Sequence, residues 1–114
     1  MTERKYPCRV DAVTDGDTLL ATIDAGFRVH VQSKVRLLGI DCPELSTPEG
    51  KLARDFVVNW VLKATATLAD WPFQLLCTGY DKRDKYGRWL GDFYLESGKS
   101  LVKDLLEAGH VKAK

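Results

Sequence analysis

The nine residues RLLGIDCPE, numbers 36–44, decide the fold that we expect for this chain. The apolar Val35 and Leu37 alternate with Arg36, which predicts a β-strand that carries Arg36 on the face opposite its apolar neighbours. Gly39 then ends the alternation. The stretch therefore predicts a strand that is buried on one face and runs directly into a turn.

That turn is acidic. Asp41 and Glu44 flank Pro43, which restricts the backbone and stiffens the turn. Charged groups beside an apolar core are costly unless they are paired, hydrogen-bonded or bound to a metal. One arginine and two carboxylates at the end of such a strand favour a binding or catalytic site, and the alternative is a surface turn with an incidental salt bridge.

Two further strands are expected before this one. Asp15-Gly16 is a strong hairpin signal, and strand-like residues flank it over residues 6–14 and 17–25. After a turn at Ala25-Gly26, the third strand is expected over residues 28–40. One face of it is formed by Val29, Val31, Val35 and Leu37.

A helix is expected to follow the acidic turn. Thr47 suits the N-cap, Pro48 the first helical position and Glu49 the positive end of the helix dipole. Apolar residues then recur at helical spacing, and we expect them to pack in the core rather than to perform chemistry. These residues are Leu52, Ala53, Phe56, Val57, Trp60 and Ala64.

The last part of the chain predicts a second hairpin and a short helix. The hairpin strands cover residues 73–80 and 88–95, with a charged loop between them. Ser100 is expected to cap the short helix, and Gly109 to stop it. The order is βββαββα. It predicts a single α+β domain over residues 1–114, built on a five-stranded OB-fold barrel.

The bulk composition is that of an ordinary soluble globule, with 45% hydrophobic and 29% charged residues and a net charge of +1. No apolar run is long enough to span a membrane, and the first residues contain no signal peptide. The three cysteines lack CxxC spacing, so we expect reduced thiols rather than a zinc site. A cytoplasmic location is favoured, and a secreted mature form stays open. His30 and His110 are expected to be structural or surface residues.

Two short motifs accompany the central stretch. DGDT, residues 15–18, is by itself a good turn, and DKYGR, residues 84–88, is by itself a solvated loop. With RLLGIDCPE between them, in this order, they resemble the staphylococcal nuclease family. That family carries a DGDT turn, an R-L-x-x-[IV]-D-x-P-E run and a DKYGR loop. The resemblance extends from about residue 10 to residue 109.

The resemblance implies a Ca²⁺ site. Asp17 and Asp41 would each supply a carboxylate, and Cys42 would supply its backbone carbonyl in place of the usual threonine. Carboxylate and carbonyl oxygens suit a hard cation, so Mg²⁺ and Mn²⁺ stay open as alternatives.

The resemblance also implies catalytic and substrate-binding residues. Glu44 would be the general base that activates water, and Arg36 and Arg88 would hold the phosphate. Lys85 and Tyr86 would contact a substrate phosphate. The implied activity is a Ca²⁺-dependent endonuclease that cleaves DNA, RNA or both with little sequence preference. The alternative is a catalytically silent OB-fold module that binds nucleic acid or a protein partner.

The chain departs from the family pattern after Gly109. It ends at Lys114, so we expect it to lack the family's usual C-terminal helix and the tyrosine that stacks on a substrate base. This predicts weaker, less base-selective binding with the chemistry retained. It also predicts either a monomer or a weak homodimer.

Overall fold

The computed structural model describes residues 4–65, 70–81 and 88–113 of the chain. The elements follow one another as three strands, a two-residue strand, a long helix, two strands, a short helix and a second two-residue strand. They are β1 (Arg4–Asp15), β2 (Thr18–Asp24), β3 (His30–Leu37), β4 (Ile40–Asp41), α1 (Pro48–Thr65), β5 (Phe73–Asp81), β6 (Arg88–Tyr94), α2 (Leu101–Glu107) and β7 (Lys112–Ala113).

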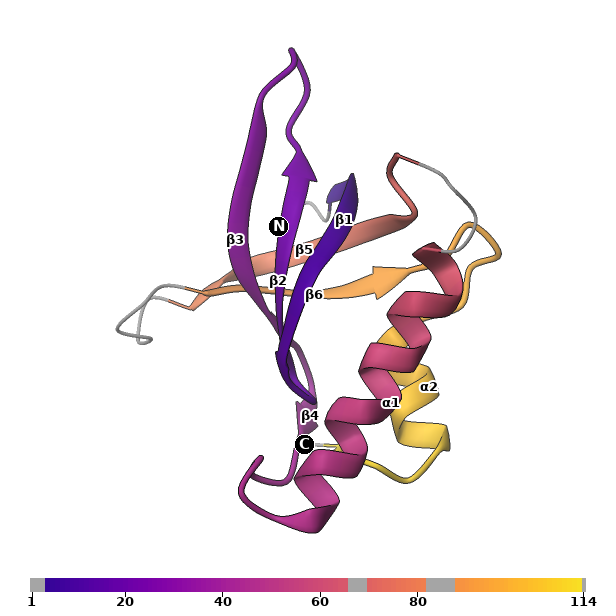
Figure 1. Ribbon diagram of the computed structural model, residues 1–114. Coiled ribbons are helices and arrows are strands. Elements are labelled where there is room, and N and C mark those ends of the chain that lie inside the picture. Colours follow the sequence, from indigo (N-terminus) through magenta and orange to yellow (C-terminus); the bar gives the residue numbers. More distant parts are fainter. Residues whose placement is uncertain (1–3, 66–69, 82–87, 114) are drawn as a thin grey trace.

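Five strands close into a barrel in the order β1-β2-β3-β6-β5. Four of the strand pairs are antiparallel, and β3 runs parallel to β6, with Val35 opposite Trp89. In Figure 1 the meander of β1, β2 and β3 crosses the β5–β6 hairpin, as expected of strongly coiled strands around one core. The predicted OB-fold barrel with two helices is confirmed.

The third predicted strand, residues 28–40, was too long at both ends. Phe27 and Arg28 have positive φ angles of 53° and 62° and belong to the turn between β2 and β3. At the other end Gly39, with φ 83°, bends the chain between β3 and β4. The strand β4 then leaves the barrel and pairs with β7 in a small separate sheet that the sequence did not predict.

The helix α1 begins as predicted, because the N–H of Gly50 donates a 3.0 Å hydrogen bond to the Thr47 side chain. Ala53, Val57 and Trp60 face the core and are buried. The prediction for Leu52 was wrong, since 57% of this residue is exposed. The stripe of α1 that the barrel buries is narrower than the stripe of apolar residues in its sequence, and Leu52 lies outside the buried stripe.

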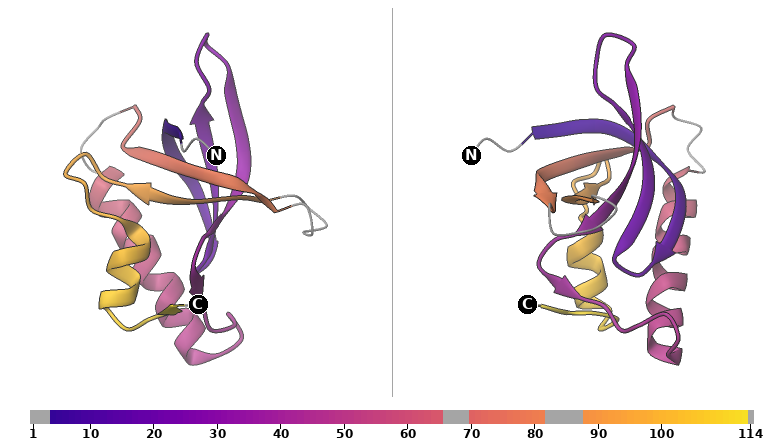
Figure 2. Two further views of the ribbon diagram at one scale, coloured as in Figure 1. Left: turned by 180° about the vertical axis from the view of Figure 1, so that it is seen from behind. Right: turned by 90° about the vertical axis from the view of Figure 1, so that its left-hand side faces the viewer.

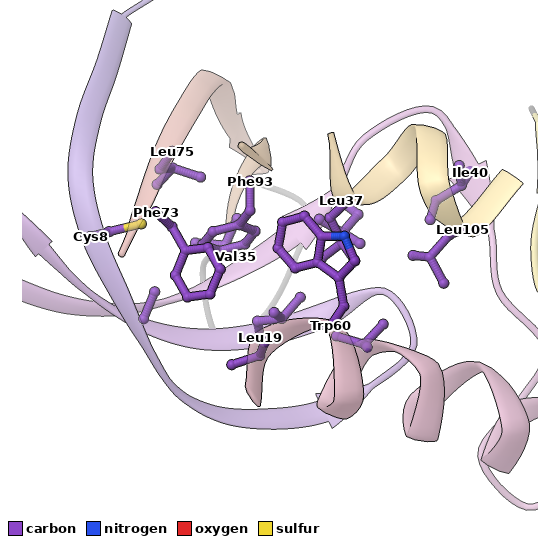
Figure 3. Close-up of a cluster of buried hydrophobic side chains, with 14 of the residues drawn as sticks. Cys8, Leu19, Val35, Leu37, Ile40, Trp60, Phe73, Leu75, Phe93 and Leu105 are labelled. Carbon is purple, nitrogen blue, oxygen red and sulfur yellow. The ribbon is translucent and has the colours of Figure 1, made fainter. Parts of the chain in front are cut away.

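Aromatic packing fixes the helices on the barrel. Figure 3 shows Trp60 reaching from α1 into the buried cluster, where its ring stacks on Phe73 with centroids 5.5 Å apart. Phe73 in turn packs edge-on against Phe93 of β6. The Trp60 indole N–H donates a 2.8 Å hydrogen bond to Asp104 on α2, so one residue joins both helices to the core.

The helix α2 is capped at both ends as predicted. The Ser100 side chain accepts from the Lys103 N–H, and Gly109, with φ 78°, follows the last turn. After it the chain turns back to β7, which ends beside β4 (Figure 2). No helix among the residues described above is both long enough and apolar enough to cross a membrane.

Candidate active site

The DGDT motif forms a tight two-residue turn between β1 and β2. Asp15 pairs with Thr18 across the hairpin, and the backbone N–H of Asp17 donates a 3.1 Å hydrogen bond to the Asp15 carboxylate. The Thr18 hydroxyl donates to the Asp17 carboxylate at 3.1 Å. Both acidic side chains are therefore held by their own turn, and both are half-buried.

This turn is hydrogen-bonded to the end of β3. The N–H of Leu37 donates a 2.8 Å bond to the backbone carbonyl of Asp17, and Thr18 lies opposite Arg36 in the β2–β3 register. The positive charge of Arg36 acts on the Asp17 carboxylate from the neighbouring strand. The DGDT motif and the stretch RLLGIDCPE thus meet at one end of the barrel.

The two carboxyl groups of the turn have opposite pKa shifts. Burial raises the pKa of Asp17 to about 6, and the hydrogen bond and negative charge of Asp15 add to this against smaller effects of Thr18 and Arg36. Burial also favours the neutral form of Asp15, but hydrogen bonds from Asp17 and Thr18 lower its pKa. Two close carboxylates resist full ionisation, and a bound cation would relieve that repulsion.

Gly16 brings the DGDT turn into contact with the acidic turn and with α1. A Cβ atom at Gly16 would lie 2.5 Å from the Cys42 sulfur and 2.9 Å from the Ala53 Cβ. Burial and the charges of Asp17 and Asp15 raise the pKa of Cys42 to about 11. Its sulfur is therefore a neutral thiol at pH 7, a poor ligand for a hard cation, and the predicted role of its carbonyl stays a prediction.

Asp41 and Glu44 are carried by the short β4 and by the turn that leads to α1, and both residues are exposed. Asp41 pairs with Lys112 of β7. It also lies at the edge of a largely apolar cleft of about 480 Å³, whose walls include Leu52 and His110. The predicted metal ligand therefore borders a hollow between α1 and the segment before β7.

The described part of the chain contains no group of three His, Cys, Asp or Glu side chains arranged to hold a metal ion. The predicted donor set consists of two carboxylates, Asp17 and Asp41, and one backbone carbonyl, and needs no third acidic side chain. These are hard oxygen donors, and Asp15 adds negative charge beside Asp17. The residues present thus fit a hard divalent cation in their chemistry.

The second hairpin contributes less to the described site. Arg88 begins β6 and pairs with Asp81, and Leu90 lies opposite Arg36 across the β3–β6 pair. The side chain of Arg88, like Lys85 and Tyr86, lies outside the described residues. Their predicted contacts with phosphate stay predictions.

Sequence reasoning gave Asp15 no role beyond the turn. The structure makes it the hydrogen-bond and charge partner of Asp17. The signal was present in the DGDT spacing, because Asp15 and Asp17 are separated only by Gly16 within a tight turn and cannot lie far apart.

Residues 34–114 match the family described as "Staphylococcal nuclease homologue". The chain belongs to the staphylococcal nuclease family. The match begins after the DGDT turn, and the bond between Leu37 and Asp17 ties that turn to the matched region.

Two curated proteins are similar to this chain over more of its length than the family match covers. An "Uncharacterized endonuclease" of Escherichia coli O157:H7 is 32% identical over 101 residues, covering 89% of this chain and 56% of that protein. "Endonuclease YhcR" of Bacillus subtilis (strain 168) is 31% identical over 119 residues, covering 95% of this chain and 9% of that protein. The chain therefore spans little more than half the length of the Escherichia coli relative.

Proposed function

We propose that this chain is a Ca²⁺-dependent endonuclease that hydrolyses phosphodiester bonds of DNA, RNA or both with little sequence preference. The proposal rests on the 2.8 Å bond from Leu37 to Asp17, which holds an acidic turn against the strand of Arg36. Family membership and the relatives named as endonucleases support the same activity.

Asp17, Asp41 and the Cys42 carbonyl would hold the cation. A bound Ca²⁺ would offset the negative charge of a phosphodiester as an anionic nucleophile approaches. The raised pKa of Asp17, about 6, supports this role, because a carboxyl group that is crowded by Asp15 gains most from a cation.

Arg36 and Arg88 hold the phosphate. A guanidinium group can donate two hydrogen bonds to one phosphate and keeps its charge at any physiological pH. Arg36 is half-buried beside the DGDT turn, where its interaction with an anion is screened less than at a fully exposed site. Lys85 and Tyr86 add contacts to a neighbouring substrate phosphate.

Glu44 takes a proton from the attacking water. Its exposed carboxylate is free to reach a water molecule beside the phosphate, and general-base catalysis of this kind is worth roughly 10²- to 10⁴-fold in rate. The proton passes from water to the Glu44 carboxylate as the oxygen bonds to phosphorus. The bond to the leaving sugar oxygen breaks, and that oxygen takes up a proton from solvent water.

The test is to incubate the protein with single-stranded DNA and with RNA, each with Ca²⁺ or with EGTA. We expect internal cleavage of at least one substrate with Ca²⁺ and none with EGTA. Cleavage that persists in EGTA would contradict the metal-dependent mechanism. Binding without cleavage would favour the alternative, a silent OB-fold module.

A further inference from the structure

The backbone carbonyl of Glu44 is fixed by one residue three positions later. The N–H of Thr47 donates to it at 2.9 Å, and the Thr47 hydroxyl donates to it at 2.6 Å. The same hydroxyl oxygen accepts the 3.0 Å bond from Gly50 that caps α1. Thr47 therefore connects the backbone of Glu44 directly to the first turn of the helix.

Gly50 packs against that same carbonyl group. A Cβ atom at this position would overlap the Glu44 carbonyl oxygen and would lie 2.5 Å from its carbon and 2.9 Å from the Leu45 nitrogen. These are backbone atoms, so they cannot move aside as the end of a flexible side chain could. Glycine is a poor helix former, and this close approach explains why it occupies the first turn of α1.

We propose that Gly50 and Thr47 are positioning residues for Glu44, an inference that rests on the proposed role of Glu44 as general base. The exposed Glu44 side chain extends from a backbone that these two residues hold against α1. The start of α1 thus sets where the carboxylate can lie relative to the attacked phosphate. A displacement of about 1 Å at a reacting group can lower the rate roughly 10²-fold.

Gly50→Ala tests this inference on a Ca²⁺-dependent reaction with a single-stranded DNA oligonucleotide. We expect kcat to fall about 10²-fold while the dissociation constant for Ca²⁺, measured by calorimetry without DNA, stays within twofold. Combined with Glu44→Gln, the substitution should have no further effect on kcat. The matched control is Asn59→Ala, which places alanine at an exposed position of α1 and should leave kcat unchanged.

A second pair of variants tests the Thr47 hydroxyl without adding a clash. Thr47→Val should lower kcat, and Thr47→Ser, which keeps the oxygen, should restore it to near the wild-type value. The positioning role is overturned if Gly50→Ala or Thr47→Val keeps wild-type kcat in a protein that Glu44→Gln inactivates.

Hydrogen exchange decides the same question without any activity. In Gly50→Ala, the amide of Thr47 should lose protection because its bond to the Glu44 carbonyl is broken, while the amides of Val57 and Trp60 stay protected. An unchanged Thr47 amide overturns the positioning role. If the wild-type protein cleaves neither DNA nor RNA, the proposed function fails, and the exchange result still decides whether Gly50 holds this turn.

Discussion

The N–H of Leu37 donates a 2.8 Å hydrogen bond to the carbonyl of Asp17, so the DGDT turn is held at the end of the strand that carries Arg36. The two residues are twenty positions apart in the chain, and the antiparallel pairing of β2 with β3, in which Thr18 lies opposite Arg36, brings them together. The proposed metal ligand Asp17 and the proposed phosphate ligand Arg36 are therefore held next to each other by the same pair of strands.

The raised pKa of Asp17 predicts a pH-dependent stability of the metal-free protein. The folded state holds this proton up to about pH 6, whereas the ordinary value is 3.8. Stability should therefore fall as the pH rises from about 4 to about 6, because the folded state binds more protons there than the unfolded state. Asp17→Asn should be more stable than wild type above pH 6, and this advantage should disappear below about pH 4. Urea unfolding in EGTA measures it, and a difference that is the same at all pH values would contradict the assignment.

Gly16→Ala should weaken Ca²⁺ binding. The new methyl group would meet the Cys42 sulfur and the Ala53 side chain and push the Asp17 turn away from its support. We expect roughly a tenfold higher dissociation constant, equivalent to about 1.4 kcal/mol. Adding Cys42→Ala removes the sulfur and should recover part of the affinity. Strictly additive effects in calorimetry would show that the two residues do not compete for this space.

Arg36→Lys should keep the fold and lose most of the activity. Lysine keeps the charge but cannot make the paired hydrogen bonds of a guanidinium group, and loss of a phosphate-stabilising donor lowers kcat by roughly 10²–10³-fold. Arg9→Lys is the control, since Arg9 pairs with Asp11 on β1. Equal cleavage rates for the two variants would contradict the proposed role of Arg36 in holding the phosphate.

Trp60 should contribute strongly to stability. Trp60→Ala removes the stacked contact with Phe73 and should lower the free energy of unfolding by about 3–5 kcal/mol. Trp60→Phe keeps an aromatic ring but loses the hydrogen bond to Asp104, which we expect to cost about 1 kcal/mol beyond the change in packing. Denaturant unfolding of both variants checks the order, and equal losses would mean that the hydrogen bond rather than the stack holds the helices.

Local chemistry made much of this fold predictable from the sequence. The hairpin at DGDT and the caps at Thr47 and Ser100 depend on neighbours only a few residues away, and the structure confirms all three, with the turn at Gly16 and Asp17, one residue later than predicted. The apolar spacing of α1 also identified the helix, though not the exposure of Leu52. The exposure of Leu52 depends on how much of the surface of α1 the barrel covers, and this is determined by tertiary packing.

The parts that sequence reasoning missed depend on contacts between distant segments. The pairing of β4 with β7 joins Asp41 to Lys112, which lies 71 positions later in the chain. The pKa of Asp17 and the fit of Gly16 against Cys42 arise only when separate turns meet. The three motifs predicted which residues belong together, while the contacts that support them required the structure.

The most direct measurement is the initial rate of oligonucleotide cleavage by wild type and by Glu44→Gln at saturating Ca²⁺, with Ca²⁺ affinity measured on both proteins. If Glu44 activates water, the rate should fall by roughly 10²- to 10⁴-fold while the affinity for Ca²⁺ is unchanged. A Glu44→Gln protein that cleaves at the wild-type rate would contradict the proposed mechanism.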